Sequence, residues 1–185
     1  IKAGQGLDEF SFLVWTTTPW TLISNVALAV GPKITYVKIK FKDTGEKIIL
    51  AKERLAVIKE EYEVLGEVTG SELERVEYEQ LMPYVQPDPE KKAFYVTIGD
   101  FVSTEDGSGI VHIAPAFGED DYQVSRKYGL PIMQPVDKSG KFTDDITDFK
   151  GRFVKEADDD IILKLKEKKK LYKKEKFVHS YPHCW

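Results

Sequence analysis

Alternating apolar and charged positions form the clearest pattern in the first third of the chain. Apolar residues from Val37 to Phe41 alternate with lysines, which is the period of a half-buried strand with one face in water. The polar turn residues 43–46 follow, and a second apolar run extends from Lys47 to Leu50. The pattern predicts a β-hairpin in which Gly45 adopts the positive φ of the turn.

Other short apolar runs, bounded by Gly, Pro or Asp, predict strands at 11–15, 63–68, 94–102, 109–114 and 131–136. Helical spacing predicts helices at 52–59, 119–128 and 158–174, and the proline-rich stretch 83–89 indicates a rigid extended loop. Many short strands with few helices favour an α+β fold, with a β-barrel-like core of short strands decorated by short helices. We expect a single domain over residues 1–185.

Composition narrows the class of protein. With 42% hydrophobic and 31% charged residues, the 185-residue chain is typical of globular proteins, and its net charge of −4 argues against a dedicated nucleic-acid binder. Any RNA contact should therefore be local, and the candidates are Lys164, Lys168 and Lys169 on the last predicted helix. A solvated surface helix is the simpler interpretation of these lysines.

The same composition bears on the compartment. No apolar run reaches the roughly 20 residues that cross a bilayer, and the first residues lack the apolar core of a signal peptide. A single cysteine, Cys184, cannot form an internal disulfide, which agrees with a reducing compartment. We expect a cytoplasmic protein without membrane contact.

The segment from Trp15 to Thr21, Trp-Thr-Thr-Thr-Pro-Trp-Thr, is the least ordinary part of the sequence. Pro19 biases Thr18 toward an extended conformation, so that successive hydroxyls and amides point in fixed directions. Asn25 could return its amide to the same pocket if residues 19–24 form a turn or a short helix. The alternative is that these residues form an ordinary threonine-rich strand with a capped turn.

A second segment, Gly107 to Tyr122, is typical of a strand, a sharp turn and the start of a helix. His112 and Asp121 lie nine positions apart across that turn and could face one cavity. A buried structural histidine and a solvated acidic residue are the simpler interpretations. A triad of Ser108, His112 and Asp121 is another alternative, but the segment lacks the G-x-S-x-G pattern of serine hydrolases.

Cofactor chemistry is not indicated. His179, His183 and Cys184 lack the paired spacing of a zinc site, so we predict no metal. The sequence contains neither a P-loop nor a dinucleotide-binding fingerprint.

Taken together, the segments 15–21, 107–122 and His-Ser-Tyr-Pro-His-Cys-Trp at 179–185 resemble the editing insertion, or connective peptide 1, of isoleucyl-tRNA synthetases. The form Thr-Thr-Thr-Pro-Trp-Thr differs from valyl and leucyl relatives, which resemble Thr-Thr-Arg-Pro. One departure is Ser108, where the family commonly has threonine. The end of the chain resembles the point at which the insertion rejoins the catalytic domain. We therefore expect a piece excised from a larger synthetase.

The resemblance implies hydrolysis of valine wrongly esterified to isoleucine tRNA, and of valyl-adenylate. Valine and isoleucine differ by one methylene, which supplies only about 1–3 kcal/mol of discrimination, as the isoleucyl enzyme itself illustrates. A second pocket that is too small for isoleucine removes the error. ATP and magnesium would serve only the missing synthetic part, because its His-Ile-Gly-His and Lys-Met-Ser-Lys-Ser signatures are not in this sequence.

The resemblance also implies roles for individual residues. Asp121 should pair with the α-ammonium of the substrate. The catalytic residues would be Asp121 with Thr17 and Thr18, acting by positioning and charge stabilisation. The remaining substrate-binding residues would be Thr16, Trp20, Thr21, Asn25 and His112, of which Trp20 and His112 form the wall that rejects isoleucine.

Three alternatives remain open at this point. The chain could be a non-catalytic module that docks the acceptor end of tRNA, an editing domain of valyl specificity, or an unrelated serine esterase. The expected partners are the acceptor end of isoleucine tRNA, the valine moiety and the rest of the synthetase. The domain itself is expected to be a monomer.

Overall fold

A computed structural model describes residues 1–175 and contains two β-sheets. The first sheet has the strand order β1-β4-β3-β5, and the second has the order β6-β2-β7. The strands are β1 (Phe10–Phe12), β2 (Ala27–Val30), β3 (Thr35–Phe41), β4 (Lys47–Ala51), β5 (Tyr62–Thr69), β6 (Tyr95–Ile98) and β7 (Ile110–Ile113). Strands β3 and β4 pair antiparallel, and Gly45 in their turn has φ 74°. The predicted hairpin is confirmed.

The second sheet has at its centre a strand that the sequence pattern did not predict. Strand β2 pairs parallel with β6 and antiparallel with β7. All four of its residues are buried, so the alternation that identifies a half-exposed strand is missing. A strand covered on both faces carries no such signal.

One expected strand is absent from the structure. Residues 131–136 form no strand, and only an isolated bridge joins Val136 to Phe142. Pro131 and Pro135 remove two of the amide donors that a strand would need. The α+β class is confirmed: the strands of residues 1–175 form two sheets, which do not close into a complete barrel.

The helices of residues 1–175 are fewer than the strands. They are the 3-10 helices η1 (Pro19–Ser24) and η2 (Lys52–Val57) and the α-helices α1 (Gly70–Leu73), α2 (Glu119–Tyr128) and α3 (Val154–Glu167). The bounds of α2 agree with the prediction, and η2 replaces the helix expected at 52–59. Helix α1 was missed, although Thr69 and Glu72 form a capping box at its start.

The last helix lies nearer the N-terminus of the chain than predicted. We expected it at 158–174, but α3 starts at Val154 and ends at Glu167. Its buried stripe consists of Val154, Ala157, Ile161 and Leu165, at helical spacing. The lysines after Leu165 continue no such stripe, so the helix ends soon after its buried stripe ends.

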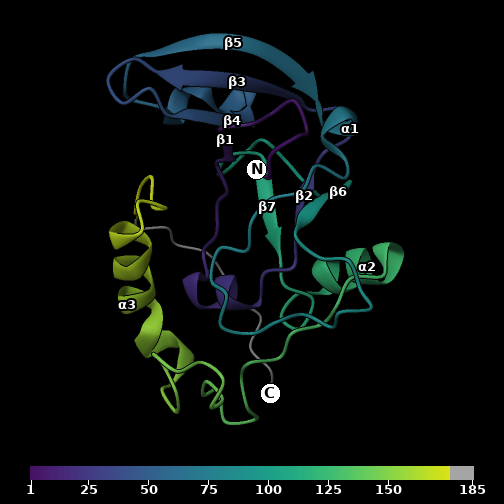
Figure 1. Ribbon diagram of the computed structural model, residues 1–185, viewed down its shortest axis with the longest axis vertical. Coiled ribbons are helices and arrows are strands. Elements are labelled where there is room, and N and C mark those ends of the chain that lie inside the picture. The colour runs from purple at the N-terminus through teal and green to yellow at the C-terminus, as the bar shows by residue number, and fades with distance from the viewer. Residues whose placement is uncertain (176–185) are drawn as a thin grey trace.

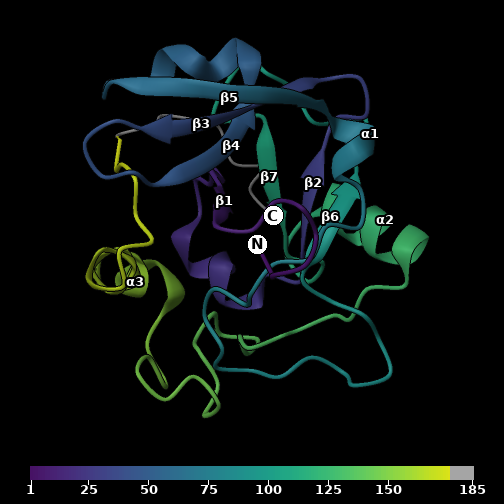
Figure 2. The same ribbon diagram turned by 45° about the horizontal axis from the view of Figure 1, so that its top comes forward.

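Figure 1 shows the first sheet lying across one end of the molecule, with the strands of the second sheet beneath it. Figures 1 and 2 both place α2 and α3 on opposite sides of the second sheet. The two sheets are joined through the phenol of Tyr36 on β3. Its oxygen accepts a hydrogen bond from the Gly31 amide (3.0 Å) and donates one to the Gly109 carbonyl (2.8 Å). Gly31 follows β2 and Gly109 precedes β7, so this side chain bridges both sheets.

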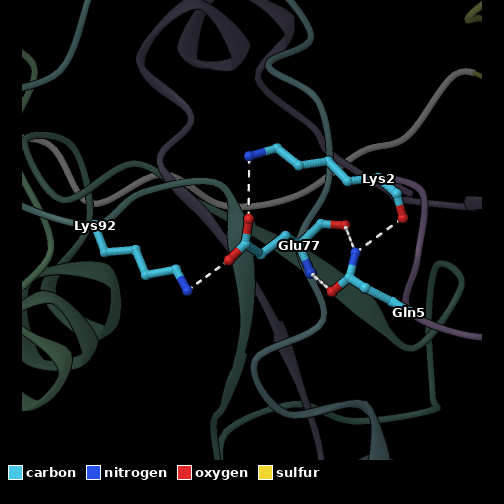
Figure 3. Close-up of polar contacts among 4 residues, drawn as sticks. All are labelled: Lys2, Gln5, Glu77 and Lys92. Atoms are coloured by element: carbon cyan, nitrogen blue, oxygen red, sulfur yellow. Dashed lines mark hydrogen bonds and ion pairs between the residues drawn. The ribbon is translucent and has the colours of Figure 1, made fainter.

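The first residues of the chain are tied to the segment before β6 (Figure 3). The Glu77 carboxylate pairs with Lys2 (3.1 Å) and Lys92 (2.5 Å). The Gln5 side-chain amide donates to the Glu77 carbonyl and accepts from the Glu77 amide. Exposed ion pairs contribute little, about 0–1 kcal/mol each. The Gln5 contacts, which imitate the pairing of a strand, fix the position of the terminal segment.

Strand β5 forms an edge of the first sheet and contains an irregularity. Lys38 pairs with Gly66 and Ile39 pairs with Val64, which leaves Leu65 as an extra residue. This arrangement is a β-bulge. Gly66 has φ 154°, a value that side-chain-bearing residues rarely adopt.

Candidate active site

Two segments that are distant in sequence form the candidate site. The chain around Trp15 runs beside β7. The Trp15 amide donates to the Ile110 carbonyl (3.3 Å), and Trp15 forms an isolated parallel bridge with Val111. Gly107 makes this approach possible, because a Cβ at that position would lie 2.8 Å from the Trp15 ring. The threonines after Trp15 are thereby placed next to the His112 strand.

These segments line a cavity of about 200 Å³ that is open to the surface on one side. Sites for drug-sized ligands are usually about 300–1,000 Å³, so this cavity suits a group of amino-acid size. It is lined by Trp15, Thr16, Thr17, Thr18, Thr21, Val111, His112, Ala114, Phe117 and Asp121. Six of the eight residues expected at the site therefore share one cavity, and Trp20 and Asn25 do not line it.

The threonine hydroxyls form a connected network at the cavity. Thr16 Oγ1 accepts from the Thr18 amide (3.0 Å), and the Thr18 and Thr21 hydroxyls are 3.0 Å apart. Thr21 Oγ1 donates to the Thr18 carbonyl (2.8 Å). Because the Thr21 proton is used there, Thr18 must be the donor in the bond between their hydroxyls. The polarity of the network is thus fixed by one backbone carbonyl.

His112 joins this network from β7. Its Nε2 lies 3.1 Å from Thr21 Oγ1 and 3.4 Å from Thr16 Oγ1. Since the Thr21 proton is committed to the Thr18 carbonyl, we infer that Nε2 carries the imidazole proton and donates it to Thr21. His112 Nδ1 is then an acceptor, and it has no hydrogen-bond partner within residues 1–175.

Burial lowers the pKa of His112 to about 4. The imidazole is therefore neutral at neutral pH and does not compete as a cation for the carboxylate of Asp121. A neutral ring also keeps the donor and acceptor pattern of the hydroxyl network intact.

The acid sensitivity of the fold follows from this pKa. The unfolded state binds a proton at His112 below about pH 6.5 and the folded state only below about 4, so stability is complete above 6.5 and is lost as the pH falls through this window. The pKa difference between the two states corresponds to on the order of 3 kcal/mol of folding free energy.

We expect a His112→Gln variant to lose less stability than the parent when the pH falls from 6.5 to 4, as measured by chemical denaturation. Equal losses in both proteins would contradict this, and a nitrogen NMR titration of His112 reads its pKa and tautomer directly.

Asp121 faces the cavity from the first turn of α2. Its Oδ1 accepts a hydrogen bond from the Ala114 amide (2.6 Å), which ties the end of β7 to the start of the helix. Gly118 leaves room for the carboxylate, because a Cβ there would lie 2.2 Å from Asp121 Oδ2. Burial is the largest influence on the carboxyl group and raises the pKa of Asp121. A half-buried acid that forms no ion pair with any residue of the described part, 1–175, is suited to bind a cationic ligand.

Two expected site residues lie elsewhere. Asn25 is buried with its side-chain amide engaged: Nδ2 donates to the Ala27 carbonyl (2.8 Å), and Oδ1 accepts from the Tyr78 hydroxyl (2.6 Å). Trp20 packs edge-on against Phe117, with the ring centroids 4.8 Å apart. Asn25 thus supports the end of η1, and Trp20 supports the cavity wall from behind. The expected turn of η1 is present, but it directs both side chains into the core.

The geometry gives no support to a serine triad. Ser108 is buried, its hydroxyl donates to the Ile110 carbonyl (3.3 Å), and it does not line the cavity. His112 contacts threonine hydroxyls instead.

The candidate RNA-binding lysines differ from one another. Lys164 forms an ion pair with Asp148, and its ammonium lies over the Tyr84 ring, 5.2 Å from the centroid. Lys168 and Lys169 are exposed just beyond the last residue of α3. Phosphate contact remains a prediction, and Lys168 and Lys169 are better placed for it than Lys164.

Three further predictions concern a metal site, membrane contact and the final motif. Within residues 1–175, no group of three or more potential ligands could hold a metal ion, and no helix of this part is long and apolar enough to span a bilayer. His179, His183 and Cys184, with the final motif, lie outside the described residues.

Some residues of the site were not predicted individually. Phe117 and Ala114 stand within the segment 107–122, and Trp15 begins the threonine segment, so their place in these motifs was the available signal. Asp158 stands in the run Asp158-Asp159-Asp160, which carried no site prediction. Its Oδ1 accepts from the Trp20 amide (2.9 Å), a contact that no local pattern could reveal.

Comparison with known proteins gives a consistent result, although no family model matches the chain. The chain is 53% identical to the isoleucine-tRNA ligase of Clostridium acetobutylicum and 52% identical to that of Clostridium novyi, over 98% of its length in both cases. It is 44% identical to the isoleucine-tRNA ligase of Chlamydia trachomatis serovar A, and that match covers 100% of this chain. It spans 17% of the length of the first two ligases and 18% of the third.

Comparison with solved structures identifies proteins with the same fold. The structure of GlLeuRS-CP1 matches with a TM-score of 0.66 at 18% identity, covering 97% of this chain and 88% of that chain. The P. falciparum cytosolic leucyl-tRNA synthetase editing domain matches with a TM-score of 0.65 at 12% identity, over 86% of this chain and 77% of that one. At these identities the likeness concerns the fold alone. The chain therefore belongs to the isoleucyl-tRNA synthetase family, as the segment with the fold of the connective peptide 1 editing domain.

Proposed function

We propose that this domain hydrolyses the ester between valine and the terminal adenosine of isoleucine tRNA, and that it also hydrolyses valyl-adenylate. The observation that carries the proposal is the presence of the Asp121 carboxylate and the hydroxyls of Thr16, Thr17, Thr18 and Thr21 on one small cavity. The family membership supports it, because isoleucine-tRNA ligases must discriminate against the smaller amino acid valine.

Asp121 would recognise the α-ammonium group that every aminoacyl ester carries. Its carboxylate has one oxygen bonded to the Ala114 amide, so its direction is fixed before the substrate arrives. A charge-assisted bond of this kind is about twice as strong as a neutral one. It would orient the ester carbonyl toward the threonines.

The threonines would position the water and the ester. In the reaction, a water oxygen attacks the ester carbonyl carbon, the bond to the ribose oxygen breaks, and that oxygen leaves as the adenosine hydroxyl after taking a proton. Thr21 has its proton and acceptor sites in use within the protein, whereas no hydrogen bond from the Thr17 side chain to another described residue was found. We therefore assign direct contact to Thr17. Thr18 would contact the substrate through its oxygen as an acceptor, because its proton is donated to Thr21. Thr16 and Thr21 would bind substrate by shaping the cavity. Catalysis rests on positioning and charge stabilisation.

Discrimination would come from the size of the cavity. Its apolar wall consists of Trp15, Val111, Ala114 and Phe117. His112 completes the wall, and Trp20 acts on it through Phe117. An added methylene against a well-packed wall costs about 1–3 kcal/mol.

The decisive experiment compares two esters of the same tRNA. The 185-residue chain, at saturating concentration, is incubated with isoleucine tRNA charged with valine or with isoleucine. We expect release of valine to be about tenfold to two-hundredfold faster than release of isoleucine. Equal rates for both esters would remove the proposed size selection.

The same assay separates the rival functions. A non-catalytic docking module would bind the charged tRNA and leave both esters at their spontaneous rate of decay. An editing domain of valyl specificity would release threonine from valine tRNA faster than valine from isoleucine tRNA.

The proposed partners are the acceptor end of isoleucine tRNA and the remainder of the synthetase, with the domain a monomer in the cytoplasm. No cofactor is assigned to this reaction. Contact with phosphates would involve Lys168 and Lys169 more than Lys164, because Lys164 is paired with Asp148.

A further inference from the structure

The N-terminus of η1 does not use the cap that its own sequence offers. Thr18 stands at the N-cap, but its hydroxyl makes no cap bond and instead contacts the Thr16 and Thr21 hydroxyls. Pro19 has no N–H to satisfy, and the Thr21 amide donates to the Thr18 carbonyl. The Trp20 amide is the donor that remains at this end of the helix.

The acceptor for this amide comes from another helix. Asp158 Oδ1 on α3 accepts from the Trp20 amide at 2.9 Å, across 138 positions of sequence. Helix α3 lies beside η1 in both views of the molecule (Figures 1 and 2). The two helices share a buried apolar cluster that includes Leu22, Ala157 and Ile161. Asp158 is therefore held in place by packing around it.

A second contact carries the effect of Asp158 to the cavity wall. The Trp20 ring meets Phe117 edge-on, with an interplanar angle of 73°. Phe117 lines the cavity, whereas Trp20 does not. Fixing the Trp20 backbone thus fixes the ring that supports the wall.

We propose that Asp158 is a positioning residue for this cavity, which keeps the Thr18 hydroxyl in the network that lines the cavity and holds Trp20 against Phe117. In its absence the unsatisfied Trp20 amide attracts the Thr18 hydroxyl, since threonine at an N-cap accepts from the second or third helical amide. Thr18 then turns away from the cavity and the Phe117 wall loses its support. The proposal rests on the proposed function to the extent that this cavity is the hydrolytic site.

Three variants test the role of Asp158. Asp158→Ala removes the acceptor, Asp158→Asn keeps an oxygen at the same place, and Asp159→Ala is the matched control. Asp159 is exposed, pairs with Lys174 and makes no hydrogen bond to η1. We expect Asp158→Ala to lower kcat for valyl-tRNA about tenfold or more and to reduce the preference for valine over isoleucine. Asp158→Asn should remain within about threefold of the parent, and Asp159→Ala should match it.

A measurement without substrate keeps this test separate from the proposed function. Hydrogen exchange followed by NMR should show a protected Trp20 amide in the parent, in Asp158→Asn and in Asp159→Ala. In Asp158→Ala the amide should exchange faster, because a Thr18 cap at the cavity opens to water more readily than a contact packed between two helices. If none of the proteins hydrolyses the ester but this pattern is found, the positioning contact stands and the proposed function fails. Unchanged Trp20 exchange in Asp158→Ala, or an Asp158→Asn variant as impaired as Asp158→Ala, would overturn the proposal.

Discussion

Replacement of Asp121 by asparagine is expected to slow the release of valine from isoleucine tRNA about a hundredfold, because the substrate ammonium loses its charged partner. Asparagine retains an oxygen for the Ala114 amide, so the start of α2 should keep its position. Single-turnover deacylation by the parent and the variant gives the comparison.

The matched control is Asp120→Asn, which removes the same charge from the neighbouring exposed position outside the cavity lining. This variant should deacylate at nearly the parent rate. Asp121→Asn activity within about threefold of the parent would show that the carboxylate does not bind the substrate.

The Asp121→Asn variant should lose activity without losing stability. Burial raises the pKa of Asp121, so the folded state holds its proton to higher pH than the unfolded state. Folding stability therefore falls as the pH rises from the unfolded pKa of 3.8 through the higher pKa of the folded state. At neutral pH the charged group therefore opposes folding, and the asparagine variant should melt no lower than the parent. Sites for cationic ligands commonly carry such a cost.

Replacement of Tyr36 by phenylalanine is expected to lower the free energy of unfolding by about 4 kcal/mol. The variant leaves the Gly31 amide and the Gly109 carbonyl without their shared partner, and each buried unsatisfied group costs about 1–3 kcal/mol. Both groups are buried where the two sheets meet, so water cannot easily replace the phenol. Urea denaturation of both proteins measures the difference.

Tyr62→Phe is a suitable control, since Tyr62 lies on β5, is only partly buried, and has no hydrogen bond found for its hydroxyl within residues 1–175. Its stability should change by less than about 1 kcal/mol. A Tyr36→Phe variant as stable as this control would mean that the phenol does not join the sheets. Burial also raises the pKa of Tyr36 to about 12, so its hydroxyl should remain protonated at pH 10, when exposed tyrosines ionise.

The parts of the fold that sequence could predict are those with a local signal. The β3–β4 hairpin shows alternation and a glycine turn, and α2 begins with acidic residues and ends before Gly129. The two cavity-forming segments stood out because threonines between tryptophans and a glycine-rich strand end are uncommon. Each of these features can be read from neighbouring residues.

The rest depended on contacts between distant residues. Strand β2 is apolar throughout, so nothing in its pattern separates it from a buried helix. The direction of the Asn25 and Trp20 side chains is decided by Tyr78 and Phe117, which lie far away in sequence. Asp158 illustrates the same point, because its partner amide belongs to the other end of the chain.

The irregular outer strand β5 has a consequence for handling the domain at high concentration. A straight, apolar sheet margin can recruit a like strand from another molecule, which begins self-association. Here the extra residue Leu65 interrupts the row of amides and carbonyls, and Glu63 adds a negative charge to the same margin. The domain is therefore protected from strand exchange along this margin, and removing Leu65 to straighten the strand should promote precipitation.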